Sequence, residues 1–171
     1  MNRNRFIVWL TLVFLLLGSA KSFAADAAEA DRINAIVIAC ERLEHDYAIY
    51  RDRGDAVAFA NIFTEDGEWG RATTVLKGRD AIRDYIVSSS DHPPEAHMQF
   101  TTTIQITPVD ETTATGISYA IVLEAPIQEG GLPVTISAFQ VASESRSLYK
   151  LTDDGWKIAT REYTTMFVDP E

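Results

Sequence analysis

The sequence has few of the residues that build disulfides, metal centres and phosphate-binding loops. It contains one cysteine, Cys40, so an internal disulfide is excluded. The histidines and acidic residues are not spaced like metal ligands, and there is no glycine-rich phosphate loop. The serine run at residues 88–90 lacks the Gly-x-Ser-x-Gly context of a nucleophile. We therefore expect no metal and no redox or nucleotide cofactor.

Positive charge is also scarce. Lys and Arg number 15 against 25 Asp and Glu, which gives a formal net charge of −10. A surface this acidic repels phosphate backbones and anionic lipids, which argues against nucleic acid or a membrane surface as a partner. Cys40 falls within an apolar helical stripe, and we interpret it as a small buried hydrophobic residue.

Residues 1–24 have the three parts of a secretory signal peptide. Arg3 and Arg5 precede an apolar run at residues 6–17, which is shorter than the roughly 18–20 residues that span a bilayer. Ser22-Phe23-Ala24 then places small residues where a signal peptidase cleaves. We expect cleavage near Ala24-Ala25, a periplasmic or secreted protein, and no stable membrane insertion after processing. The cleaved segment carries three basic residues and no acid, so the net charge would become −13. An uncleaved membrane anchor is the alternative interpretation.

The rest of the chain predicts three helices at the start of a single domain. Residues 25–30 are interpreted as a short linker and residues 31–171 as the domain, which is long enough to bury a core. Apolar residues from Ile33 to Tyr50 recur at steps of three and four and predict an amphipathic helix over residues 31–51. Gly54 ends this helix, and Asp55 caps a short second helix that extends to Phe63. A turn at residues 64–67, a strand carrying Trp69 and Val75, and a third helix after Gly78 follow.

The second half predicts strands. A loop at residues 88–95, which contains Pro93-Pro94, is followed by alternating patterns at residues 97–106 and 117–124. Gly130-Gly131 leads into a long strand that ends at Leu151, and Asp153-Asp154-Gly155 predicts a hairpin to a return strand at residues 156–167. Three helices followed by four antiparallel strands predict an α+β domain, with the helices on one face of a curved sheet.

Several segments occur in the order typical of one family. They are residues 47–55, 62–69 and 78–82, the strand that carries His97, and the closing hairpin from Tyr149 to Arg161. In this order, residues 31–168 resemble SnoaL-like proteins of the nuclear transport factor 2 superfamily. The resemblance implies a cone-shaped α+β barrel, in which three N-terminal helices pack on a curved, mostly antiparallel sheet around one interior pocket.

The resemblance is to a subgroup that includes scytalone dehydratase, bile-acid 7-dehydratases and hexachlorocyclohexane dehydrochlorinase. Those enzymes eliminate water or HCl without a cofactor, use a His–Asp pair, and are usually trimers. The resemblance implies that His97 and Asp52 are catalytic and that Tyr47 and Arg161 bind substrate. Trp69 and Ser118 are also interpreted as substrate-binding residues, with Trp69 as a pocket wall. The chain departs from the subgroup in three places: Thr101 stands where relatives often carry Asn, Ser118 replaces the second histidine of the scytalone enzyme, and Arg71 replaces one of its pocket tyrosines.

These residue types suit proton abstraction from carbon. An imidazole has a pKa near working pH, and a carboxylate on its far ring nitrogen fixes the tautomer and stabilises the imidazolium. His97 would be the base and Asp52 its partner, with Tyr47 and Arg161 stabilising developing negative charge. Asp52 also lies at a helix C-terminus, an unfavourable place for a carboxylate. The alternatives are a turn aspartate with an unrelated strand histidine, a core tyrosine at position 47 and a solvated Arg161.

The sequence therefore predicts a cofactor-free lyase or isomerase for a small hydrophobic cyclic or carbonyl-bearing molecule. A non-catalytic protein that binds such a molecule, and an association module without a ligand, are the alternatives. The free face of the sheet and the family resemblance both predict a homo-oligomer, a trimer or a dimer.

Overall fold

A computed structural model describes residues 3–71, 73–89, 95–136 and 140–168, and the side chains within these ranges from Ala25 onward. The chain divides into two compact units, Met1–Ala35 and Ile36–Glu171. In the first unit the described residues are helical. The second unit contains the rest of the same helix and every other helix and strand, and all functional arguments below concern this unit.

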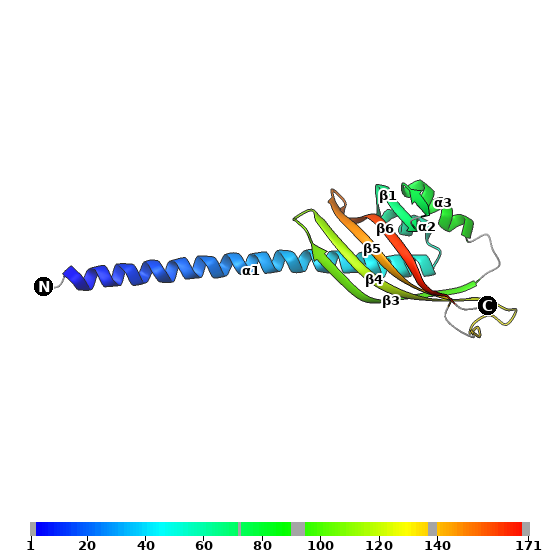
Figure 1. Cartoon of the computed structure of the whole chain (residues 1–171), viewed down its shortest axis with the longest axis horizontal. Helices are drawn as coiled ribbons and strands as arrows, with labels where there is room; N and C mark the ends of the chain where they lie inside the picture. Colours follow the sequence, from blue (N-terminus) through cyan, green and yellow to red (C-terminus); the bar gives the residue numbers. More distant parts are fainter. Residues whose placement is uncertain (1–2, 72, 90–94, 137–139, 169–171) are drawn as a thin grey trace. The chain divides into compact units, whose positions relative to one another are not determined.

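The second unit is an α+β domain built on a six-stranded sheet. The elements are α1 (Arg3–Asp52), α2 (Ala56–Asn61), β1 (Phe63–Arg71), β2 (Thr74–Lys77), α3 (Arg79–Ser89), β3 (Glu95–Pro108), β4 (Thr113–Pro126), β5 (Val141–Thr152) and β6 (Gly155–Val168). The strand order is β2-β1-β6-β5-β4-β3, and only the β1–β6 pair is parallel. Figure 1 shows the long strands β3 to β6 curving past the end of α1, with α2 and α3 beside β1. The predicted fold class is confirmed.

Helix α1 starts well before the predicted position. Residues 25–30, which were expected to be a linker, are helical, because Ala and Glu are strong helix formers. The predicted C-terminal end is accurate to one residue, and Gly54 adopts the left-handed conformation (φ 63°) that ends the helix. None of the helices in the described ranges is both long enough and apolar enough to cross a membrane.

The second helix begins as expected and ends early. The Asp55 carboxylate accepts a hydrogen bond from the Ala58 amide at 3.0 Å and so caps α2. The helix stops at Asn61 because Phe63, fully buried, already belongs to β1. Phe59, Phe63 and Tyr149 lie in a core cluster with the apolar stripe of α1. Cys40 is also fully buried in this cluster, and burial raises its thiol pKa to about 12.

The predicted turn at residues 64–67 is wrong. These residues belong to β1, whose register with β6 shifts between Phe63 and Glu68. Gly67 permits this irregular stretch, because a Cβ there would lie 2.9 Å from the Phe63 Cβ. The single strand expected to hold both Trp69 and Val75 is an antiparallel pair, β1 and β2.

The long strand expected after Gly130-Gly131 begins only at Val141. Residues 132–136 have no regular structure, and Pro133 has no amide hydrogen to donate to a sheet. The predicted loop at residues 88–95 cannot be compared in full, because residues 90–94 lie outside the described ranges.

The apolar side chains at the start of β3 lie on the exposed face of the sheet. Met98 and Phe100 are 53% and 47% exposed, whereas His97 and Gln99 line an interior cavity. A register shift between Thr102 and Ile104, with Thr103 at φ 45°, marks a bulge that moves the following residues to the other face. The polar alternation at His97 therefore marks a cavity wall.

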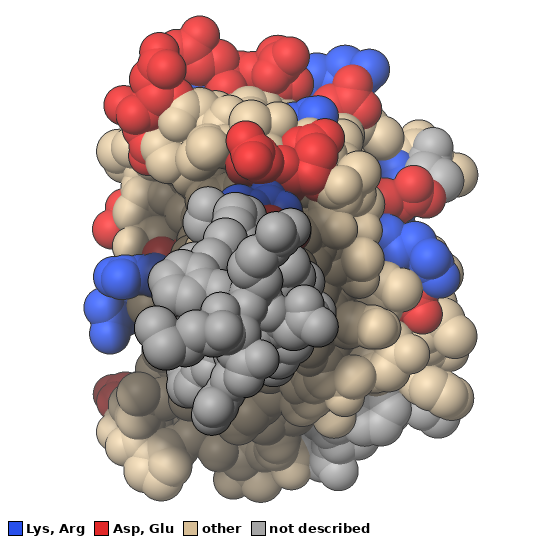
Figure 2. All heavy atoms as spheres, turned by 90° about the vertical axis from the view of Figure 1, so that its left-hand side faces the viewer, with Lys and Arg blue, Asp and Glu red and all other residues tan. Residues whose placement is uncertain are grey.

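Acidic side chains dominate part of the surface. In the view of Figure 2 they gather along the upper edge, while Lys and Arg side chains are scattered toward the sides. This distribution agrees with the net charge of −10.

Candidate functional site

The last turn of α1 and the start of β3 bring Asp52 and His97 together. The His97 Nδ1 atom lies 2.9 Å from Asp52 Oδ1, although the two residues are 45 positions apart. The two side chains are 15% and 21% exposed, so the pair is shielded but reachable. The contact expected from the sequence is present in the structure.

Asp52 is held by the backbone of β3 as well as by His97. The Gln99 amide donates to both carboxylate oxygens, at 3.0 and 3.2 Å. These bonds offset the unfavourable position of a carboxylate at a helix C-terminus, because an amide hydrogen is a donor directed at the negative charge. The Asp52 carboxylate thus has a fixed position from which it orients the imidazole.

The environment favours the neutral form of His97. Burial lowers the pKa of the imidazole, and the nearby positive charge of Arg51 lowers it further, while the hydrogen bond to Asp52 acts in the opposite direction. With Asp52 accepting at Nδ1, the hydrogen of the neutral ring lies on Nδ1 and Nε2 keeps its lone pair. Nε2 is then the basic atom available to a ligand.

His97 faces a cavity of about 230 Å³ inside the domain. Tyr47 and Trp69, two of the predicted site residues, also line it. The remaining lining residues come from α1, β1, α3, β3, β4, β5, β6 and the segment before β5: Arg51, Arg71, Tyr85, Gln99, Ala120, Val122, Glu124, Gln140, Val141, Ser143, Ser145, Tyr163 and Thr165. Aromatic and charged side chains thus share one small space.

Tyr47 is positioned by two neighbours. The Trp69 Nε1–H donates to the Tyr47 hydroxyl oxygen at 3.0 Å, and the Arg161 guanidinium carbon lies 4.2 Å from the centroid of the Tyr47 ring. Because the hydroxyl oxygen accepts from Trp69, its own hydrogen is free to donate to a ligand. Burial raises the pKa of Tyr47, and the charge of Arg161 opposes that rise, so the phenol is a neutral donor beside a positive charge.

Arg161 and Ser118 do not line this cavity. Arg161 is 2% exposed and forms an ion pair with Glu44, with 2.5 Å between Arg161 Nη1 and Glu44 Oε1. Ser118 donates to Glu44 Oε2 at 2.7 Å, and Tyr149 donates to Glu44 Oε1. Arg161 also donates to Ser147 at 3.0 Å and to Ser118 at 3.3 Å. The structure therefore places Arg161 and Ser118 in a buried network, one layer behind Tyr47.

Glu44 is the residue that the sequence interpretation missed. It lies on the first helix and, despite its charge, is 1% exposed. Burial raises the pKa of its carboxyl group, but the charge and hydrogen bond of Arg161, with the hydrogen bonds from Tyr149 and Ser118, bring it below the ordinary value. Its position could have revealed it, because Glu44 is four residues after Cys40 and three before Tyr47, on the apolar face of the helix.

Of the other two histidines, only His45 lies in the part of the chain that the structure describes. His45 is exposed on α1, and His92 lies outside the described residues. No group of three or more His, Cys, Asp or Glu residues that could hold a metal occurs in the described part of the chain.

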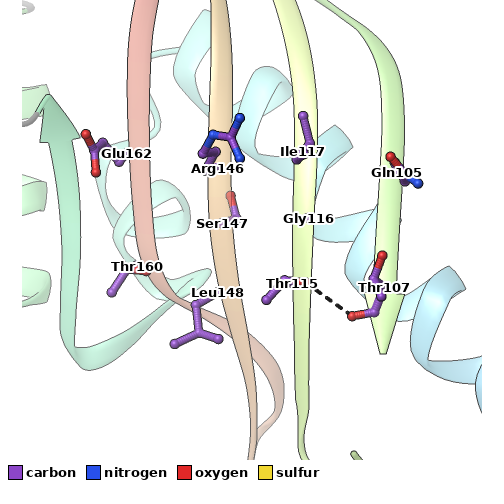
Figure 3. Close-up of a pocket in the computed structure, with 10 residues that line it drawn as sticks. All are labelled: Gln105, Thr107, Thr115, Gly116, Ile117, Arg146, Ser147, Leu148, Thr160 and Glu162. Carbon is purple, nitrogen blue, oxygen red and sulfur yellow. Dashed lines mark hydrogen bonds between the residues drawn. The ribbon is translucent and has the colours of Figure 1, made fainter. Parts of the chain in front are cut away.

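A larger hollow of about 480 Å³ lies on the other face of the sheet. Figure 3 shows its lining side chains projecting from β3, β4, β5 and β6, with the helices behind the sheet. Arg146 and Glu162 are its charged residues, and the Thr115 hydroxyl donates to the Thr107 carbonyl at 3.5 Å. It contains no His, Cys or Tyr, so the cavity beside His97 is the better candidate for chemistry.

Comparison with known proteins agrees with this architecture. The model of the SnoaL-like domain family matches residues 37–162. No protein with a curated description matches the sequence significantly.

Among solved structures, a scytalone dehydratase-like protein from Novosphingobium aromaticivorans has a TM-score of 0.70 at 21% identity, covering 83% of this chain and 91% of that one. A hexachlorocyclohexane dehydrochlorinase has a TM-score of 0.66 at 20% identity, covering 80% and 89%. A nuclear transport factor 2-like protein with a cystatin-like fold, also from N. aromaticivorans, has a TM-score of 0.60 at 25% identity, covering 78% and 82%. These similarities concern the fold.

Proposed function

The chain belongs to the SnoaL-like domain family, and on that premise we propose that it is a cofactor-independent lyase or isomerase whose base is His97. The observation that carries the proposal is the 2.9 Å contact between Asp52 and His97 at the wall of the cavity. A dehydratase-like and a dehydrochlorinase structure among its fold neighbours support a lyase-like role.

In the proposed reaction, the Nε2 lone pair of His97 takes a proton from a carbon next to a carbonyl group. The C–H electron pair enters the enolate, and those electrons form a carbon–carbon double bond as the bond to a β-hydroxyl group breaks. The departing hydroxide takes the proton from the imidazolium and leaves as water, so His97 returns to its neutral form. In an isomerase the same proton would instead return to a different carbon.

The other groups act through position and charge. Asp52 stabilises the imidazolium, and the Gln99 amide keeps Asp52 in place. Tyr47 donates its hydroxyl hydrogen to the carbonyl or enolate oxygen, because Trp69 occupies the oxygen's acceptor side. Arg161 acts as a positioning residue, since its guanidinium lies against the Tyr47 ring and is itself held by Glu44.

The proposal is tested by following hydrogen exchange and water loss in a panel of cyclic β-hydroxy ketones in D₂O by NMR. A positioned base contributes about 10²–10⁴-fold, so His97→Ala and Asp52→Asn should each lower the rate by that order. The double variant should be little slower than His97→Ala, because the two residues act as a unit. His45→Ala is the matched control, since His45 is exposed on the same helix as Asp52.

The result also separates the enzyme from a binding protein. If substrates of the panel bind but neither exchange nor water loss depends on His97, the chain is a small-molecule-binding protein and the proposed chemistry is wrong. Equal rates for wild type and His97→Ala on every compound that reacts would have the same meaning.

Export and self-association remain predictions. We propose that the chain is processed near Ala24-Ala25 and works in the periplasm or outside the cell as a homo-oligomer. The exposed side chains of Met98, Phe100 and Ile121 on the outer sheet face suit contact with a second copy. An intact Met1 in the exported protein, or a light-scattering mass equal to one mature chain, would contradict the respective prediction.

A further inference from the structure

The cavity beside His97 contains two arginines that have no ion-pair partner in the described part of the chain, Arg51 from α1 and Arg71 from the end of β1. Most of the other basic residues that the structure describes with a side chain do form ion pairs. Arg32, Arg42, Lys77, Arg83, Arg146 and Arg161 each form an ion pair with a carboxylate. Unpaired guanidinium groups in a cavity of a protein with net charge −10 call for an explanation.

The charge of Arg51 acts on the interior of the cavity. Arg51 is only partly exposed, and its positive charge lowers the pKa of His97, of Tyr47 and of Glu124, all of which line the cavity. A guanidinium directed into solvent would be screened from these three groups. Arg51 therefore supplies positive potential where a ligand would lie.

Arg71 is at the open side of the cavity and has a defined position. It is exposed, and its guanidinium carbon lies 5.3 Å from the centroid of the Tyr163 ring, which also lines the cavity. Stacking on an aromatic ring leaves the edge of a guanidinium free, and that edge carries the paired N–H donors that fit a carboxylate.

The carboxylates in and beside the cavity do not cancel this charge. Asp52 already accepts from His97 and from the Gln99 amide. Burial and the neighbouring Glu95 raise the pKa of Glu124, although Arg51 opposes the rise, so Glu124 holds its proton more tightly than an ordinary glutamate. Among the lining residues Arg51 and Arg71 are basic and Glu124 is acidic, whereas the protein as a whole has a net charge of −10.

The walls indicate the rest of the ligand. Trp69 packs edge-on against Tyr85 with 5.3 Å between ring centroids, and its ring lies 6.4 Å from that of Tyr163. Ala120 and Val122 add apolar surface. A volume of about 230 Å³ is below the range of about 300–1,000 Å³ found for drug-sized ligands, which limits the ligand to a single small ring with short substituents.

We propose that the cavity binds a small cyclic compound carrying one carboxylate, with the carboxylate on Arg51 and Arg71 and the ring against the aromatic wall. The substrate class is thus a monoanionic ring acid rather than a neutral apolar molecule. This inference builds on the proposed function, because the carboxylate would anchor the ring while its acidic C–H lies at His97 Nε2.

The test is equilibrium binding by calorimetry, with benzoate and cyclohexanecarboxylate as probes and benzamide and cyclohexanecarboxamide as their neutral counterparts. The carboxylates should bind at least about tenfold more tightly than the amides, and higher salt should narrow the difference, as a charge-dependent contact requires. Arg51→Gln and Arg71→Gln should each remove most of the preference, while Arg51→Lys and Arg71→Lys should retain part of it.

Arg53→Gln is the matched control, because Arg53 is exposed two residues after Arg51. Thermal unfolding of each variant confirms that the fold is intact. Equal affinity for benzoate and benzamide, or a preference unchanged in both arginine-to-glutamine variants, would overturn the proposal.

A second variant keeps this inference separate from the proposed function. His97→Asn should retain the preference for carboxylates, because the imidazole does not hold the charge. If the preference depends on Arg51 and Arg71 but turnover does not depend on His97, the anion site stands and the proposed chemistry fails. If turnover depends on His97 while ring acids and amides bind equally, the chemistry stands and the anion site fails.

Discussion

Two acid–base pairs, Glu44–Arg161 and Asp52–His97, lie between α1 and the sheet, and their acidic residues are eight positions apart on the helix. The pairs differ in whether a polar atom faces the cavity. In the first, Glu44 and Arg161 have side chains that are each 1% exposed, and both Glu44 oxygens accept hydrogen bonds. In the second, Asp52 is equally well bonded, but His97 lines a cavity and its Nε2 atom has no partner among the described residues.

The difference separates support from chemistry. A buried ion pair that does not line the cavity has no atom within reach of a substrate there, and removal of one partner leaves an uncompensated charge. A pair with one free basic atom at a cavity wall can exchange protons with a ligand. The sequence resemblance placed Arg161 beside substrate, whereas the structure places it behind Tyr47, where it bears on chemistry only through that ring.

The largest expected effect is on the stability of the fold when the buried Glu44–Arg161 pair, called the closed pair below, is altered. Glu44→Gln should lower the free energy of unfolding by about 3–5 kcal/mol, because Arg161 keeps its charge in a buried site without a counter-ion. Asp52→Asn should cost about 1 kcal/mol or less, because asparagine retains an oxygen that can accept from the Gln99 amide. Urea denaturation of both variants measures the contrast.

Glu41→Gln is the control for this comparison, since Glu41 is on the same helix and is not buried. If Glu44→Gln and Asp52→Asn destabilised the protein equally, the division into a structural and a functional pair would be wrong.

A smaller effect should follow from crowding the closed pair without changing its charges. A Cβ at Gly116 would lie 2.8 Å from the Tyr149 hydroxyl oxygen and 2.9 Å from Ile106 Cδ1. Tyr149 is fully buried and donates to Glu44, so its ring cannot move aside freely. Gly116→Ala should therefore cost about 1–3 kcal/mol, the usual range for overpacking.

Thermal unfolding measures this variant, and Gly130→Ala is its control, because nothing lies within 4 Å of a Cβ at Gly130. A Gly116→Ala protein as stable as wild type would show that the network around Glu44 is looser than its contacts indicate.

The sequence predicted the elements whose signals are local. The apolar stripe of the first helix, the left-handed Gly54 and the Asp55 cap depend on neighbours within a few residues. The structure confirms the glycine, the cap and the stripe from Ile36 onward, whereas Ile33 is 37% exposed. The prediction for residues 64–67 failed because the stretch continues β1 as a bulge between Phe63 and Glu68, which pair with Ile158 and Thr160 of β6.

The site was predicted less evenly, because burial and partners come from distant segments. The Asp52–His97 contact was expected from the family resemblance and is present. Glu44 was overlooked and Arg161 misplaced because each is acceptable in the interior only through the other, 117 residues away. The anion-binding role proposed for Arg51 and Arg71 depends on the lack of an ion-pair partner for either arginine among the described residues. A sequence alone does not show this.

The smallest expected effect is a shift in the pH dependence of kcat/KM, which is set by the Asp52–His97 pair at the cavity (the open pair). The base is active when neutral, so kcat/KM should fall as pH decreases through the pKa of His97. Burial and Arg51 lower that pKa, and Asp52 and Glu95 oppose them, so activity should exceed half its maximum at about pH 6.5, the ordinary value for histidine. Glu124 on the neighbouring strand also faces the cavity and titrates at higher pH than usual.

Arg51→Gln removes one of the two causes that lower the pKa, so the acidic limb of the profile should move to higher pH, while Arg53→Gln should leave it in place. The folded state binds this proton less tightly than the unfolded state, so part of the stability should also be lost as pH falls below about 6.5. Titration of the His97 ring by NMR measures the pKa without relying on turnover. A limb that does not move in Arg51→Gln would mean that the charge of Arg51 does not act on His97. An NMR pKa above 6.5 would mean that Asp52 outweighs burial at this site, and the Asp52–His97 pair would then be charged like the Glu44–Arg161 pair.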